Sequence, residues 1–122
     1  MEDERRNLLV VITHGIDHEL SSAGPTTGLG GMALGLKGSI FLTSAGADVV
    51  RRGAAATTHV QPLEPLADRL AGVMCRSGNL WAFRPCVKSR RYVEDRLIDG
   101  VVITSASVMH ELIKDGAATL SF

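Results

Sequence analysis

Five short blocks of apolar residues recur along the chain, and each is separated from the next by a stretch with helical character. The blocks cover residues 7–13, 39–43, 79–83, 101–104 and 118–122. Short runs rich in Val, Ile, Leu and Phe are typical of buried strands. Strands that alternate with helices at this spacing are joined by crossovers, which link parallel neighbours. The sequence therefore predicts a three-layer α/β/α fold around a five-stranded, mostly parallel sheet.

The connecting stretches predict the helical layers and one exception to them. Helices are expected at residues 21–38 and 64–78, around Val49 and Val50, at residues 92–97, and after Ser105 or Ser107, either of which can cap the last one. Residues 54–62 are small and polar, with no clear period, and predict an exposed excursion. Pro85 suits the first turn of a further helix, because a proline there gives up an amide that would be unpaired anyway.

Length and charge limit the classes of protein to consider. The chain has 122 residues, which is room for one hydrophobic core, so we expect a single domain over residues 1–122. Thirteen basic and thirteen acidic side chains cancel, so no overall field favours nucleic acid or an anionic membrane. The apolar run at residues 8–12 is too short to span a bilayer, and the charged residues before it are too acidic for a secretory signal. We expect a cytoplasmic protein without nucleic-acid or membrane partners.

The ends of the predicted strands carry the residues with useful chemistry. In an open parallel sheet, ligands bind outside the carboxyl ends of the strands, where the loops converge. The candidates there are His14 and Gly15 after the first strand, Thr43 and Ser44 after the second, Arg84, Cys86 and Lys88 after the third, and Ser105 after the fourth. Together they are expected to line one pocket.

Cys86 is the candidate nucleophile in this set. A cysteine attacks as its thiolate, and nearby cations or a helix amino-terminus favour that form. Four basic side chains lie close to Cys86 in the sequence, and no carboxylate follows until Glu94. The alternative is a buried, inert cysteine beside a solvated basic surface. Spacing alone leaves both interpretations open.

Several short motifs, in order along almost the whole chain, resemble those of the DsrE family. They are Leu-Val-Val-Ile-Thr-His-Gly from residue 9, Ala-Leu-Gly-Leu from residue 33, Ile-Phe-Leu-Thr from residue 40, Cys-Val-Lys-Ser-Arg from residue 86, Ile-Asp-Gly-Val from residue 98 and Leu-Ser-Phe from residue 120. The resemblance implies a parallel α/β sheet and a homo-oligomer, either a trimer or a hexamer. In the sulfur-relay members it also implies a persulfide on one cysteine at the end of the third strand.

One position departs from the pattern of the family. Many small DsrE-like proteins have Cys-Pro-Pro-Cys here, and the resemblance implies that the first cysteine carries the sulfur. In this chain Phe83 holds that place and Cys86 matches the second cysteine. A phenylalanine cannot hold sulfur, so either Cys86 has taken over the role or the protein keeps the fold without the relay chemistry.

The sequence is therefore consistent with two alternative functions. The first is a sulfur carrier or sulfurtransferase that uses Cys86 and meets a sulfur donor or acceptor protein. The second is a non-enzymatic, oligomeric module in which Arg84, Lys88 and a helix amino-terminus hold a small anion or ligand. A small sheet with low net charge and an apolar last strand also favours self-association.

Three other features of the sequence are not expected to form functional sites. Cys75 lies on a predicted helix and is expected to fill the core. His14, Asp17 and His18 share one loop but lack residues that would complete a metal site, so no metal is expected. The glycines of residues 28–33 begin too far beyond the first strand for a dinucleotide fingerprint, and no cofactor is expected.

Overall fold

Five parallel strands form the centre of the structure, a computed structural model that describes residues 5–122. The strands are β1 (Asn7–Ile12), β2 (Lys37–Leu42), β3 (Asn79–Phe83), β4 (Val101–Thr104) and β5 (Ala118–Ser121). Their order across the sheet is β4-β3-β2-β1-β5, and every neighbouring pair is parallel. The predicted α/β architecture is thus confirmed, with a sheet that is parallel throughout rather than mostly so.

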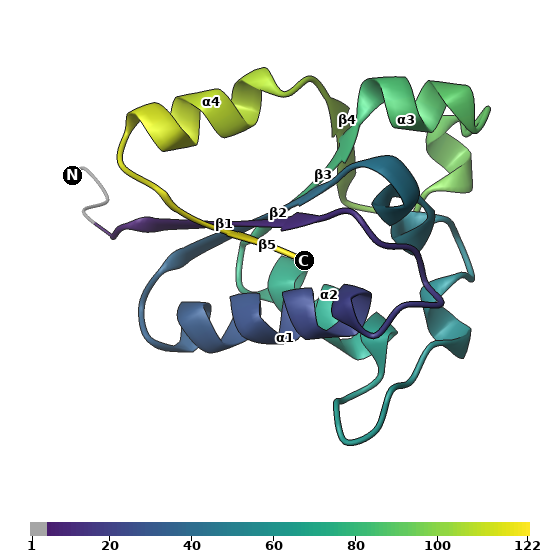
Figure 1. Cartoon of the computed structure of the whole chain (residues 1–122), viewed down its shortest axis with the longest axis horizontal. Coiled ribbons are helices and arrows are strands. Elements are labelled where there is room, and N and C mark those ends of the chain that lie inside the picture. The colour runs from purple at the N-terminus through teal and green to yellow at the C-terminus, as the bar shows by residue number, and fades with distance from the viewer. Residues whose placement is uncertain (1–4) are drawn as a thin grey trace.

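Helices cover both faces of the sheet (Figure 1). They are α1 (Leu20–Ala33), α2 (Leu66–Cys75), α3 (Arg84–Ser89) and α4 (Ser107–Lys114), with short 3₁₀ helices η1 (Ser44–Val50), η2 (Ala55–Thr57) and η3 (Glu94–Arg96). Helices α1 and α2 lie on one face, whereas α3 and α4 lie on the other. The chain moves outward from β1 to β4 and then crosses the sheet through α4 to pair β5 with the free edge of β1.

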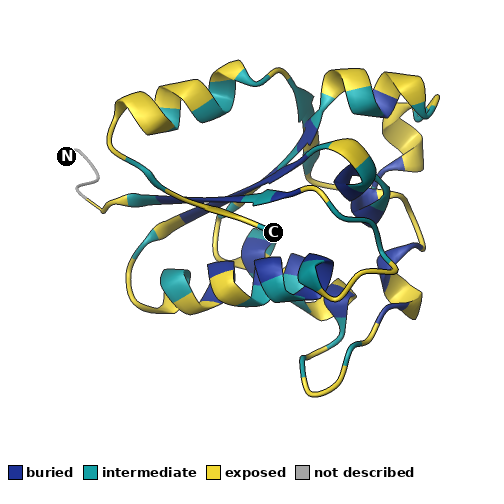
Figure 2. Cartoon of the chain, viewed as in Figure 1, coloured by how far each residue is buried: buried dark blue, intermediate teal, exposed yellow. Residues whose placement is uncertain are grey.

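The core is concentrated between the sheet and the layer of α1 and α2 (Figure 2). Alternate residues of a strand point to the same face, so Val10, Ile40 and Leu80 face this layer in register. Leu70 and Val73 of α2 are buried against them because the apolar residues of α2 recur at helical spacing. This packing fixes the strand ends from which the candidate site is built.

The opposite face is covered less completely. Leu9 and Phe41 are buried at its centre, but α4 contains no buried residue, and Val102 of the edge strand β4 is 54% exposed. Within residues 5–122, no helix is both long enough and apolar enough to cross a membrane.

Two local predictions are wrong, whereas the helix expected around Val49 and Val50 is present as the 3₁₀ helix η1. The segment at residues 54–62 is not wholly exposed, because Ala54, Ala55 and Thr58 are buried around η2. Cys75 is exposed at the end of α2 instead of filling the core, since the buried side of that helix carries Leu70 and Val73.

Candidate functional site

Cys86 lies at the carboxyl edge of the sheet, on the first turn of α3. The helix begins at Arg84, directly after β3, and Pro85 stands in its first turn as expected. The thiol is partly exposed. The backbone N–H of Ser44 donates to the Cys86 Sγ over 3.1 Å, and the hydroxyl of Thr43 lies 3.7 Å from the same sulfur. The sulfur therefore has a hydrogen-bond donor in place for the negative charge that a reactive thiolate carries.

The loop after β2 is bent so that this donor faces the sulfur. Ser44 has a φ of +55°, a left-handed conformation that few residues other than glycine adopt. Two residues later, Gly46 packs so closely on β1 that a Cβ built there would overlap the carbonyl oxygen of Ile12. The position of the donor thus depends on the backbone path of residues 44–46 rather than on a side chain.

The charges around Cys86 differ from those expected from the sequence. Arg90 is not an unopposed cation, because its Nε lies 3.1 Å from the Oδ1 of Asp48 in η1. The same guanidinium donates through Nη1 to the carbonyl oxygen of Cys86 over 3.3 Å. Arg84 donates to the carbonyl oxygen of Ile103 on β4, and Lys88 is exposed. Arg90 therefore ties α3 to η1, the two elements that meet at the sulfur.

Tyr92 completes this link by donating its hydroxyl to the Asp48 Oδ1 over 2.6 Å. Burial raises the pKa of Tyr92 above its ordinary value of 10.0, and the hydrogen bond and negative charge of Asp48 raise it further. Arg51 and Arg90 oppose these effects. The neutral phenol is thus the form that the folded chain prefers.

The raised pKa of Tyr92 predicts a loss of stability at alkaline pH. The stabilisation is fully present below pH 10.0, the unfolded value, and disappears as the pH rises through the higher folded value. Tyr92→Phe should therefore be less stable than the wild type at about pH 9, and this difference should shrink by about pH 11. Urea unfolding at both pH values measures this difference in the free energy of unfolding. Tyrosinate absorbance follows the titration of Tyr92 directly because the chain has one tyrosine. A difference between the two proteins that stays constant across this range would contradict the assignment.

His14 and Gly15 border a separate hollow beyond the end of β1. Its volume is about 410 Å³, and residues 13–18 line it together with Ala45 and Asp48. The rings of His14 and His18 stack with their centroids 4.0 Å apart. The serine hydroxyl of Ser21 donates to the carbonyl oxygen of His14 over 2.7 Å and helps to hold this loop on α1.

The predicted site residues thus form two groups and a remainder. Cys86 lies with Thr43 and Ser44, whereas His14 and Gly15 line the hollow beyond β1. Ser105 forms a hydrogen bond with Ser107 beyond β4. The described residues that line the hollow beyond β1 do not include Ser105, Ser107 or Cys86.

Sequence reasoning missed Asp48 and the role of Tyr92. Asp48 lies 42 residues from Arg90 and 44 residues from Tyr92 along the chain. No local pattern marks such a contact, because only the pairing of β2 with β3 brings η1 beside α3. In the sequence, the basic run at residues 88–91 therefore shows no carboxylate that would oppose its charge.

Comparisons with known proteins agree with this architecture. The DsrE/DsrF-like family model matches residues 6–122. The crystal structure of the YchN protein from E. coli has a TM-score of 0.76 at 17% identity, covering 95% of this chain and 99% of its own. A protein of unknown function, MTH1491 from Methanobacterium thermoautotrophicum, has a TM-score of 0.68 at 15% identity, covering 98% of this chain and 100% of its own. No curated protein sequence gives a significant match.

Proposed function

The chain belongs to the DsrE/DsrF-like family, and from that premise we propose that it is a sulfur carrier that takes up sulfur as a persulfide on Cys86. The observation that carries the proposal is the donor from the Ser44 backbone, 3.1 Å from the Cys86 Sγ. This thiol is partly exposed and sits at the carboxyl edge of a parallel sheet, where ligands of such folds bind.

The proposed transfer conserves atoms and electrons. The Cys86 thiolate attacks the outer sulfur of a donor persulfide, and the S–S bond of the donor breaks. The inner sulfur of the donor leaves as a thiolate, and Cys86 holds the persulfide. The Ser44 N–H faces the sulfur that attacks. The Thr43 hydroxyl, 3.7 Å from the same sulfur, is near enough to reorient as the charge on that sulfur changes.

The presence of Phe83 at this position favours Cys86, rather than a second thiol, as the residue that carries sulfur. Its ring lies 5.6 Å from that of Phe41, so the position that the resemblance assigns to sulfur is occupied by an aromatic pair. The chain's other cysteine, Cys75, lies at the end of α2 and not at this edge of the sheet. The two thiols can therefore be compared directly.

Incubation with glutathione persulfide, followed by intact mass spectrometry, tests the proposal. We expect the wild type and Cys75→Ser to gain the mass of one sulfur atom, and Cys86→Ser to gain none. Cys75→Ser is the matched control because it removes an exposed thiol of the same chain. An equal gain by Cys86→Ser and the wild type would show that Cys86 is not the acceptor. Absence of any gain in the wild type would rule out the sulfur-carrier function for this donor class.

A further inference from the structure

The ion pair of Asp48 and Arg90 lies beside the residue that carries the reactive sulfur. The Arg90 Nε is 3.1 Å from the Asp48 Oδ1, and the two side chains are 29% and 33% exposed. The pair is therefore partly shielded from water and salt, which weaken fully exposed pairs. Its two members carry opposite charges, so each has the opposite effect on a thiolate in their neighbourhood.

Arg90 is connected directly to Cys86. Its Nη1 donates to the carbonyl oxygen of Cys86 over 3.3 Å. Since that oxygen and the sulfur belong to one residue, the guanidinium lies within about 10 Å of the sulfur, the screening length of 0.1 M salt. A cation at this range favours the thiolate. The hydrogen bonds described for the sulfur involve Ser44 and Thr43, so Arg90 acts on it through space, as a positioning residue.

Asp48 opposes the effect of Arg90. It belongs to η1, the helix that begins at the donor Ser44, and its carboxylate neutralises the guanidinium. Tyr92 donates to the same carboxylate oxygen over 2.6 Å. Burial and then Asp48 raise the pKa of Tyr92 above 10.0, so the phenol adds no charge near neutral pH. Two donors thus hold the carboxylate where it cancels the cation that is bonded to Cys86.

The other charged neighbours of the pair keep a nearly constant charge above about pH 7.5. Free histidine titrates near 6.5, whereas lysine and arginine titrate above about 10. These neighbours are Arg84 and Lys88 on α3, Arg91 beyond it, Arg51 after η1, and His14, Asp17 and His18 in the hollow that Asp48 also lines. Changes of the pair itself can therefore be measured without a change in this background.

We propose that Asp48 restrains the reactivity of Cys86 by neutralising Arg90, so that this ion pair sets how much of the thiol is ionised. The inference rests on the proposed function for its biological role, because a carrier must both gain sulfur and give it up. An un-ionised thiol does not attack, whereas a very stable thiolate is a weak nucleophile and a good leaving group. The pair therefore adjusts uptake of sulfur against its release.

Alkylation by iodoacetamide measures the reactivity of Cys86 without any sulfur donor. All variants carry Cys75→Ser, so that one thiol remains. Asp48→Asn keeps an oxygen for both donors but leaves Arg90 unopposed, and at about pH 7.5 it should react about threefold faster, since the gain in thiolate exceeds its loss of nucleophilicity. Arg90→Gln leaves Asp48 unopposed and should react about threefold more slowly. The double variant carries neither charge and should react within about twofold of the parent protein.

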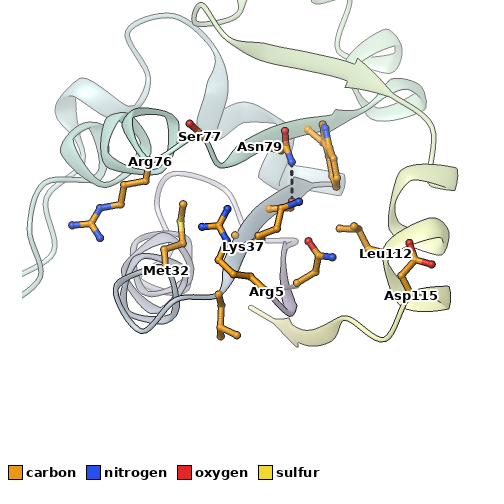
Figure 3. A pocket seen from close by; sticks show the side chains of 13 residues that line it. Arg5, Met32, Lys37, Arg76, Ser77, Asn79, Leu112 and Asp115 are labelled. Carbon is orange, nitrogen blue, oxygen red and sulfur yellow. Dashed lines mark hydrogen bonds between the residues drawn. The ribbon is translucent and has the colours of Figure 1, made fainter. Parts of the chain in front are cut away.

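The opposite edge of the sheet provides controls with the same two substitutions (Figure 3). Arg76 and Asp115 are exposed there, at the ends of α2 and α4, and they precede β3 and β5, whereas Cys86 follows β3. Arg76→Gln and Asp115→Asn should therefore react at the parent rate. Changes as large as those at residues 90 and 48 would mean that overall charge is responsible, and would overturn the proposal.

The signs of the two single variants decide the outcome. A pair that only holds α3 against η1 would slow alkylation in both variants, and loss of the second partner would not restore the rate. That pattern, or no change in either variant, would overturn the proposal, whereas opposite signs with recovery in the double variant would support it. Arg90→Lys keeps the charge without the fork of donors and should react at a rate near that of the parent. A protein that shows these signs but takes up no sulfur would contradict the proposed function alone.

Discussion

Gly46→Ala should destabilise the protein by about 3 kcal/mol or more, the upper range for forcing an extra methyl group into a packed interior. Gly46 is buried, and the new Cβ would overlap the carbonyl oxygen of Ile12 in β1. A backbone atom of a central strand cannot move aside as a flexible side chain can. The segment at residues 44–46 must therefore shift, and it carries the donor to Cys86 with it.

Urea unfolding at neutral pH measures this change, with Gly30→Ala as the matched control. Gly30 lies in α1, and a Cβ there meets nothing within 4 Å. Because alanine favours a helix over glycine, Gly30→Ala should be stabilised by up to about 1 kcal/mol. The sulfur-uptake assay adds a second readout, since Gly46→Ala should accept sulfur more slowly than Gly30→Ala. A Gly46→Ala protein as stable as the wild type would contradict the described path of this loop.

Phe41→Ala should cost roughly 3–5 kcal/mol of the free energy of unfolding. Phe41 is 1% exposed in the central strand β2, and its ring packs beside Phe83 at the end of β3. The pair lies just before the two segments that meet at Cys86, namely the loop after β2 and helix α3. Its loss should therefore weaken the fold where the site is anchored.

A double-mutant cycle with Phe83→Ala separates the contact from burial alone. Phe83 is partly exposed, so its single replacement should cost less than that of Phe41. Aromatic pairs of this geometry contribute about 0.5–1.5 kcal/mol beyond their burial, and the cycle should give a coupling energy in that range. Urea unfolding of the wild type, both single variants and the double variant provides the four values. A coupling energy of zero would mean that the rings do not stabilise each other.

The strands were predictable because their boundaries are marked locally. Residues 79–83 and 101–104 match β3 and β4, since Ser77-Gly78 and Asp99-Gly100 stop the preceding segments. The order of the strands follows less directly, because β5 pairs with β1 from the far end of the chain. Short apolar runs identify strands, whereas their partners depend on the packing of the intervening helices.

The candidate site was predictable in its position but not in its contacts. The rule for parallel sheets located Cys86, Thr43 and Ser44 at one edge, where the structure brings them together. It could not show that Asp48 opposes Arg90, because that contact requires the bend after β2. The buried Ala55 was missed for a related reason, since small residues without a period carry no signal of burial.

The donor to the Cys86 sulfur belongs to the peptide unit of Ser44, which has a consequence for how this site tolerates change. Exchange of one side chain for another at residue 44 leaves the N–H in place, provided that the left-handed turn survives. An alanine scan would therefore underestimate the importance of this position. The position of this N–H depends instead on Gly46, two residues further along, where only glycine fits against Ile12. The hydrogen bond to the sulfur can therefore be kept while the side chain at residue 44 changes.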